Sequence, residues 1–108
     1  MKESQNVKVV VFVPGTHADA VRKAVGDAGA GKIGNYSHCS FSTKGQGRFL
    51  PLNGANPTTG EIGVSEIVET ERIEFLCAKS VLEPVIAAMK KAHPYEEVSF
   101  NIYSLIEL

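Results

Sequence analysis

Hydrophobic and polar positions along the chain follow patterns that predict six helices and strands. Residues 7–13 are almost continuously apolar and rich in β-branched side chains, which is typical of a strand in the middle of a sheet. Residues 16–28 carry small apolar side chains at helical spacing, and Thr16 or Asp19 is placed to cap this helix. The apolar stripe that should face the sheet is Ala18, Val21, Ala24, Val25 and Ala28.

The middle of the chain predicts two strands separated by a long loop. Residues 36–43 alternate as a second strand, and residues 64–77 form a third. Charged residues break the alternation between Val68 and Arg72, so we expect a bulge or a strong bend there. Residues 44–63 contain five glycines and two prolines and predict a long loop between the two strands.

The last third of the chain predicts a helix at residues 80–92 and a strand from residue 98. The helix has an apolar stripe of Leu82, Val85, Ile86, Met89 and Ala92. Pro94 disfavours the helical conformation of His93, so the helix should end there. The order strand, helix, strand, strand, helix, strand predicts an α+β, ferredoxin-like βαββαβ fold, in which two helices cover one face of an antiparallel four-stranded sheet.

Such a sheet leaves one face uncovered, and this face favours self-association. The residues expected to line it are Tyr36, His38, Arg72, Glu74, Tyr103 and Leu105. Residues 105–108 add further apolar side chains next to it. We therefore expect a homo-oligomer.

Length and composition favour a single cytoplasmic domain over residues 1–108, with residues 1–6 as a flexible tail. The formal net charge of −1 argues against a nucleic-acid partner or an anionic membrane surface. The apolar run at residues 7–13 is too short to span a membrane. Two cysteines in such a chain are expected to be reduced.

Two motifs that suggest catalysis fail on their context, and we predict no catalytic residue. Residues 26–32 fit the G-x-x-x-x-G-K pattern, but Ile33 replaces the Ser or Thr of a phosphate loop, and the motif follows a predicted helix. Cys39 adjoins His38, but neighbours on a strand point to opposite faces. A small hydrolase that uses Cys39 stays as the weakest alternative.

The segment His93–Glu97 is the most chemically rich stretch, because it holds an imidazole, a phenol and two carboxylates at a helix-to-strand corner. We expect it to form a cleft with the turn at residues 31–36 and the loop at residues 45–63. The candidate ligand-binding residues are Tyr36, His38, Asn56, His93, Tyr95, Glu96 and Glu97. The only cofactor suggested is a divalent metal such as copper or zinc, with His38, His93 and Glu96 as ligands.

Each of these residues also has a purely structural interpretation. Tyr95 can plug the edge of the domain, and one of the two glutamates can accept hydrogen bonds from backbone N–H groups. The sequence leaves both interpretations open.

Three segments together carry a resemblance to a known family: residues 31–41, residues 54–57 and residues 93–97. Over residues 7–105 the chain resembles the insert domain of the Nif-three-like (NGG-interacting factor) dimetal-binding proteins. That insert resembles the CutA and PII-like fold, so the resemblance implies a trimer, with a dimer as the alternative. In the full-length family a flanking domain builds the dimetal site, so neither that site nor a linked hydrolase activity is implied here.

The resemblance implies a standalone, non-enzymatic, oligomeric module that is regulatory or binds a small ligand, with a protein partner possible. The alternative function is binding of copper or zinc in the manner of CutA.

Overall fold

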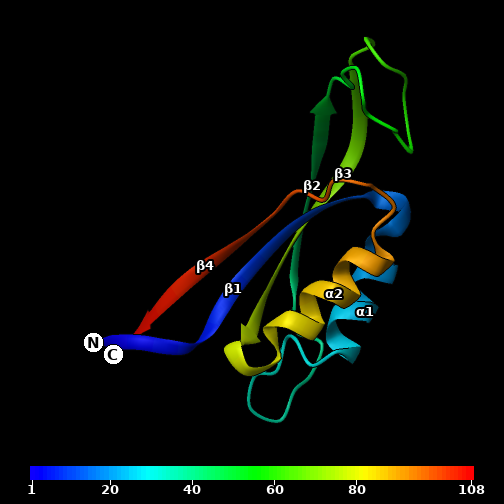
Figure 1. The fold of residues 1–108 in the computed structure, drawn as a ribbon. Coiled ribbons are helices and arrows are strands. Elements are labelled where there is room, and N and C mark those ends of the chain that lie inside the picture. Colours follow the sequence, from blue (N-terminus) through cyan, green and yellow to red (C-terminus); the bar gives the residue numbers. More distant parts are fainter.

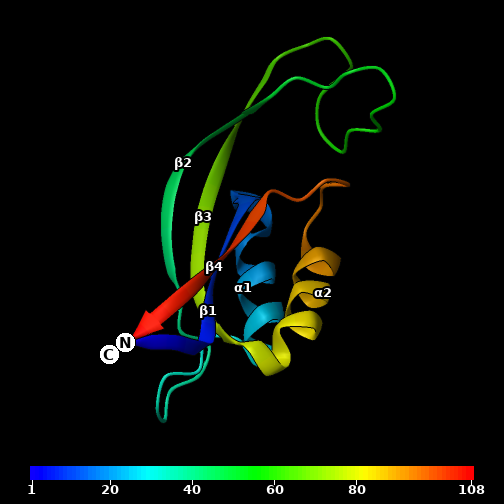
Figure 2. The ribbon, with the colours of Figure 1, turned by 60° about the vertical axis from the view of Figure 1, so that its left-hand side comes forward.

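Two helices cover one face of a four-stranded antiparallel sheet in the computed structural model, which describes all residues 1–108 (Figures 1 and 2). The strand order across the sheet is β2-β3-β1-β4. This confirms the ferredoxin-like α+β fold. The elements in chain order are β1 (Lys2–Pro14), the 3₁₀ turn η1 (Gly15–His17), α1 (Ala18–Asp27), β2 (Phe41–Phe49), β3 (Glu66–Ala78), the 3₁₀ turn η2 (Lys79–Val81), α2 (Leu82–Ala92) and β4 (Phe100–Glu107).

The core lies between the helices and the central strands. Valines 9, 11 and 13 of β1 are fully buried, because β1 has a strand on each side and the helical layer above it. The predicted helical stripes face this core, and α1 and α2 lie side by side (Figure 2). The other buried members of the core are Val7, Ala18, Val21, Val25, Ala30, Ile73, Phe75, Cys77, Val85 and Met89.

The second strand lies further along the chain than predicted. Residues 31–40 form an irregular excursion, and β2 takes up residues 41–49, of which residues 44–49 were expected in the loop. The excursion is fixed because Gly31 donates its N–H to the Leu76 carbonyl at 2.7 Å and accepts from the Cys39 N–H at 2.9 Å. Gly31 has a φ of 76°, which an L side chain rarely adopts, so the chain turns away from the sheet at this point.

The third strand pairs without a bulge, and its charged half extends beyond β1. Its pairing with β1 ends at Thr70, opposite Pro14, whereas its pairing with β2 continues to Glu66, opposite Phe49. Residues 45–49 and 66–70 therefore form a two-stranded arm, which extends beyond the rest of the sheet and bends toward the side of the helices (Figure 2). Helices do not cover this arm, so its polar residues face solvent without an interruption in the pairing.

Both chain ends are part of the sheet. Lys2 and Glu3 pair with residues 107 and 106 of β4, with a register shift between Glu3 and Val7. Residues 2–6 are thus in β1, rather than in the flexible tail that we expected. The two termini lie next to each other (Figure 1). None of the helices has the length and apolar content needed to cross a membrane.

The uncovered face of the sheet carries most of the residues predicted for it. Arg72, Glu74, Tyr103 and Leu105 alternate with the core-facing residues of β3 and β4 and therefore point away from the helices. Tyr36 and His38 were wrongly assigned to this face, because the excursion takes them out of the sheet.

Candidate functional site

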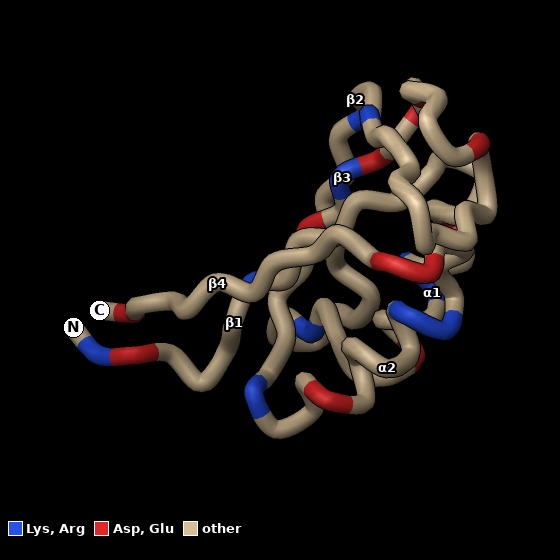
Figure 3. The backbone as a smooth tube through the Cα atoms, turned by 45° about the horizontal axis from the view of Figure 1, so that its top comes forward, with Lys and Arg blue, Asp and Glu red and all other residues tan.

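The corner at residues 93–97 and the loop at residues 50–65 hold each other in place. Figure 3 marks the corner by its acidic residues between α2 and β4. The Asn56 N–H donates to Glu96 Oε1 at 3.0 Å, and the Thr58 hydroxyl donates to the Pro94 carbonyl at 2.7 Å. The Tyr95 ring meets the Phe49 ring edge-on, with 6.0 Å between centroids. Two of the three segments that we expected to converge therefore do so.

His93 joins this corner to the middle of the sheet. It ends α2 in an extended conformation, as a residue before proline should, and its exposed fraction is 6%. Its Nε2 lies 2.7 Å from the Phe12 carbonyl, and its Nδ1 lies 3.1 Å from the Tyr95 N–H. A carbonyl only accepts and an N–H only donates, so Nε2 carries the proton and Nδ1 the lone pair.

The burial of His93 has consequences for its charge and for metal binding. Desolvation lowers the pKa of His93, with a smaller lowering from the charge of His17, while the hydrogen bond to Phe12 opposes both. Because both ring nitrogens are engaged by backbone groups, neither is available to a metal ion.

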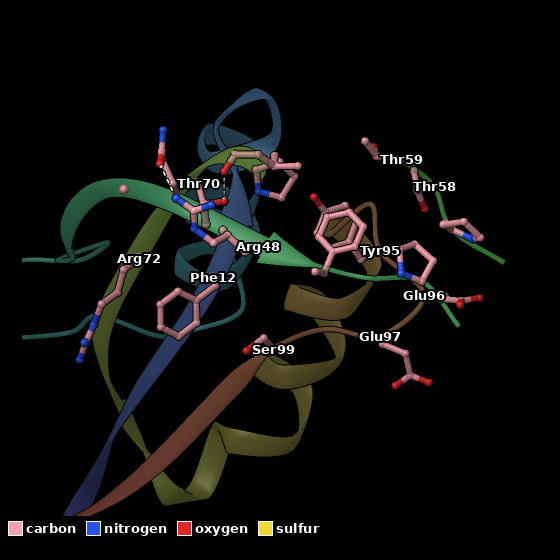
Figure 4. A pocket seen from close by; sticks show the side chains of 18 of the residues that line it. Phe12, Arg48, Thr58, Thr59, Thr70, Arg72, Tyr95, Glu96, Glu97 and Ser99 are labelled. Atoms are coloured by element: carbon pink, nitrogen blue, oxygen red, sulfur yellow. Dashed lines mark hydrogen bonds between the residues drawn. The ribbon is translucent and has the colours of Figure 1, made fainter. Parts of the chain in front are cut away.

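A cavity of about 800 Å³ lies between the arm, the loop and the corner, on the uncovered face of the sheet (Figure 4). We call it the arm cavity. One side of β3 and the whole of residues 43–49 line it, and Gly45 leaves space there because it has no side chain. The other residues of its lining used below are Phe12, Val68, Thr70, Arg72, Glu74, Tyr95, Glu96, Glu97 and Ser99.

Some of the charged side chains around the arm cavity have ion-pair partners and others do not. Arg72 lies over the Phe12 ring, 6.0 Å from its centroid, and its Nε is 3.4 Å from Glu74. Glu74 also pairs with Lys8 at 3.6 Å. Arg48, by contrast, donates only to the neutral Gln46 side chain, at 3.3 Å. Burial raises the pKa of the Tyr95 phenol, so this group stays uncharged at neutral pH.

A smaller cavity of about 280 Å³ lies on the helical side of the same loop, beside His17 and Glu69. Both cavities are lined by Pro14, Thr58, Thr59, Val68 and Tyr95. These five residues therefore separate the two cavities.

The third predicted segment lies elsewhere. His38 sits at the far end of the helices, where its Nε2 is 2.9 Å from Asp27 and its Nδ1 is 2.9 Å from the Ser37 hydroxyl. Hydrogen bonds from Lys23 and then from His38 lower the pKa of Asp27. Tyr36 is 74% exposed in the same excursion. The expected cleft of three segments is thus wrong, because its glycine turn is at the opposite end of the domain (Figure 1).

The predicted metal ligands are separated for the same reason. His38 is held by Asp27 and Ser37, whereas His93 and Glu96 lie at the corner. No group of three or more His, Cys, Asp or Glu residues is placed to hold a metal ion.

The cysteines are both free and lie apart from the arm cavity. Cys39 is half-buried, with its Sγ 3.9 Å from the Ser37 carbonyl. The ring nitrogens of His38 contact Asp27 and Ser37 and not this thiol. Cys77 is buried in the core, and burial raises its pKa.

The sequence interpretation missed the residues of β2 that build the arm cavity. Gly45 and Gly47 were counted as loop glycines, although their spacing of two places them on the same face of a strand. Arg48 and Phe49, which follow them, were missed with them. The alternation over residues 41–49 was the available signal.

No family model matches the chain, but its relatives are clear. It is 53% identical over 96 residues to the GTP cyclohydrolase 1 type 2 homolog of Bacillus subtilis, and 52% identical over 98 residues to that of Halalkalibacterium halodurans. The matches cover 89% and 91% of this chain but 26% of each relative. The chain thus spans about a quarter of the length of these curated relatives.

Solved structures agree with this. A Bacillus cereus protein related to NIF3 superposes with a TM-score of 0.82 at 53% identity, over 98% of this chain and 26% of that protein. The periplasmic divalent cation tolerance protein CutA of Archaeoglobus fulgidus (TM-score 0.67, 12% identity) is matched over 94% of this chain and 85% of its own. Bacillus subtilis GlnK (TM-score 0.61, 14% identity) is matched over 93% and 84%. CutA and GlnK show the fold alone.

Proposed function

We propose that this chain, which resembles a quarter-length segment of the NIF3-related proteins, is a non-enzymatic module that binds a small ligand in the arm cavity. The observation that carries the proposal is the cavity itself. Three segments distant in sequence build it, and direct hydrogen bonds join its loop to its corner. Its volume of about 800 Å³ is within the range of small-molecule sites, which is roughly 300–1,000 Å³.

We propose binding rather than catalysis because of where the reactive side chains lie. Cys39 and His38, the nucleophile and base considered from the sequence, are at the other end of the helices. The residues around the cavity contribute aromatic rings, hydroxyls and charges that suit recognition.

The loop gives this module a means of regulation. Ala55 and Pro57 line the cavity, so a ligand there contacts the inner side of the loop. The same loop exposes four large apolar side chains, at 46–69% of their surface: Leu50, Leu52, Ile62 and Val64. We propose that occupancy of the cavity changes how this surface is presented to a protein partner.

The module is proposed to work as a homo-oligomer in the cytoplasm, with a trimer favoured and a dimer as the alternative. Both edge strands of the sheet carry exposed apolar side chains, which supports self-association. These residues are Phe41 on β2 and Ile102, Tyr103 and Ile106 on β4. Light scattering on the pure protein tests this part, and a trimer gives three times the chain mass of 11.6 kDa.

The binding proposal is tested by screening a library of small molecules against the ¹⁵N-labelled protein by NMR. We expect at least one compound to shift the amide signals of residues 43–49 and 95–99. The Gly45→Leu variant should remove these shifts, because its side chain enters the cavity without meeting other atoms (no heavy atom lies within 4 Å of a Cβ placed there). Lys91→Leu, on the outer surface of α2, is the matched control. A library that shifts no cavity signal would contradict the proposal.

A further inference from the structure

We infer that the arm cavity selects a small planar aromatic anion, a carboxylate or a phosphate ester, whose ring lies among aromatic side chains and whose charge is bound by Arg48. This inference rests on the proposed function, since it names the chemical class of the ligand at the same site.

Aromatic side chains from three segments supply surfaces for a flat ring. Phe12 comes from β1 and Tyr95 from the corner (Figure 4), and Phe49 comes from β2. Phe49 and Tyr95 are half-buried and already meet edge-on, at an interplanar angle of 62°. Aromatic rings in proteins favour edge-to-face and offset-stacked neighbours, so a further ring is stabilised in the same arrangements.

The strand beneath these rings leaves space for a flat molecule. Gly45 is paired with Thr70 and lies on the same face of the sheet as the β3 residues that line the cavity. A Cβ added at Gly45 would have no heavy atom within 4 Å, so the space above this backbone is open. A planar ligand can therefore lie directly against the strand.

The charges that line the cavity leave a positive group on the β2 side. The Glu74 carboxylate is paired with Lys8 and Arg72, and Glu96 accepts the Asn56 N–H. Glu97 lies across the opening from Arg48 (Figure 4). Lys44 and Arg48, which both line the cavity from β2, form no ion pair, and Arg48, which adjoins Phe49, is bonded only to the amide oxygen of Gln46.

Arg48 is suited to an anion by its shape as well as its charge. A guanidinium presents parallel N–H donors that match the two oxygens of a carboxylate or a phosphate. Exchanging the neutral Gln46 oxygen for a charged one roughly doubles the strength of the hydrogen bond. A neutral ring of the same size gains only the aromatic contacts, so the site should discriminate between the two.

The test uses three naphthalene compounds of the same size: 2-naphthoate, 2-naphthyl phosphate and the neutral 2-naphthol. Their affinities for the intact chain are measured by calorimetry and by the NMR shifts of residues 43–49. We expect at least one anion to bind about tenfold more tightly than 2-naphthol, and the stronger of the two identifies the preferred anionic group.

Two variants test whether Arg48 causes the preference for the anion over 2-naphthol. Arg48→Gln, at an exposed position where the fold should be unaffected, should reduce the anion's affinity to within about twofold of that of 2-naphthol. Lys91→Gln removes the same charge from the exposed surface of α2, outside the cavity, and is the matched control, so most of the preference should remain. Gly45→Leu should weaken the binding of all three compounds.

Equal binding of 2-naphthol and both anions would overturn the inference, as would a preference that survives Arg48→Gln. If the naphthalene compounds leave the cavity signals unchanged while other library compounds shift them, the ligand class is wrong and the proposed function stands. If no compound shifts them, both are wrong.

Discussion

The two ends of the helical layer use a histidine in different ways. His93 follows α2, and His38 contacts Asp27, the last residue of α1; in both, each ring nitrogen has a hydrogen-bond partner. His93 is 6% exposed and bonds only to backbone groups, whereas the side chain of His38 is 46% exposed and bonds only to side chains. The comparison teaches that partner atoms and access to water, rather than residue type, decide what a histidine does.

The same contrast separates the two ends as candidate sites. At the His38 end the side-chain hydrogen bonds join residues of a single stretch, residues 23–38. At the His93 end, contacts join residues that are 36 to 81 positions apart in the chain. Only the His93 end encloses a large cavity, so a ligand is expected there.

The largest expected loss of stability comes from replacing His93. Comparing it with the loss from replacing His38 tests whether His93 supports the fold and His38 does not. His93→Ala should lower the free energy of unfolding by about 3 kcal/mol, because it leaves a buried carbonyl and an N–H without partners and opens a cavity. His38→Ala should cost less than about 1 kcal/mol, since water replaces its partners. Urea denaturation of both variants measures the difference. Equal losses of unfolding free energy in the two variants would contradict the distinction between the two ends.

The pH dependence of stability should follow from His93. Its pKa in the folded protein is below the ordinary value of 6.5, so protonation favours the unfolded state. Its contribution is fully present above about pH 6.5 and is lost as the pH falls toward the folded pKa, with a slope of at most about 1.4 kcal/mol per pH unit. Urea denaturation between pH 7.5 and pH 5 measures this slope. In His93→Asn the slope should flatten, whereas in His38→Asn it should persist.

At the His38 end, we expect the effect of Gly26→Ala on stability to change sign when the His38 ring is removed. A Cβ on Gly26 would overlap the His38 ring, so Gly26→Ala should destabilise the protein by about 1 kcal/mol. In a His38→Gly background the ring is absent, and the same substitution should instead stabilise α1 by about 1 kcal/mol through helix propensity. His38 has a φ of 59°, so glycine is well tolerated at this position. A double-mutant cycle by thermal unfolding measures the coupling between Gly26→Ala and His38→Gly. Strictly additive effects of the two substitutions would contradict the prediction.

The smallest effect concerns Arg22, which joins α1 to the sheet between the two ends. Its guanidinium contacts Glu71 at 2.7 Å, Asp19 at 2.6 Å and the Ser42 hydroxyl at 2.9 Å. Arg22→Ala should cost about 1 kcal/mol, because Glu71 is mostly buried and loses its partner. Lys23→Ala, which removes an exposed pair with Asp27, should cost less. The two variants are compared by urea denaturation, and equal losses would show that the burial of Glu71 does not matter.

The layered fold and the helix ending at His93 could be predicted, because they follow from local rules. Apolar spacing set the core stripes, and Pro94 set the end of α2. The start of β2 could not be predicted, because the bond of Gly31 to Leu76 acts across distant parts of the chain. The arm cavity was missed because residues 44–49 were assigned to the loop, so the alternation that places Gly45 and Gly47 on one face of β2 was not used.

The pairing of the two chain ends determines how this domain responds to mechanical force. Lys2 faces Glu107 in the ladder between β1 and β4, and their charged groups lie 3.8 Å apart. A force that separates the two termini therefore acts on one residue pair of the β1–β4 ladder at a time. It does not act on all pairs of the strand together, as a shear force would. We expect the outer pairs to open at low force, and the register shift between Glu3 and Val7 to be the first point at which extension pauses.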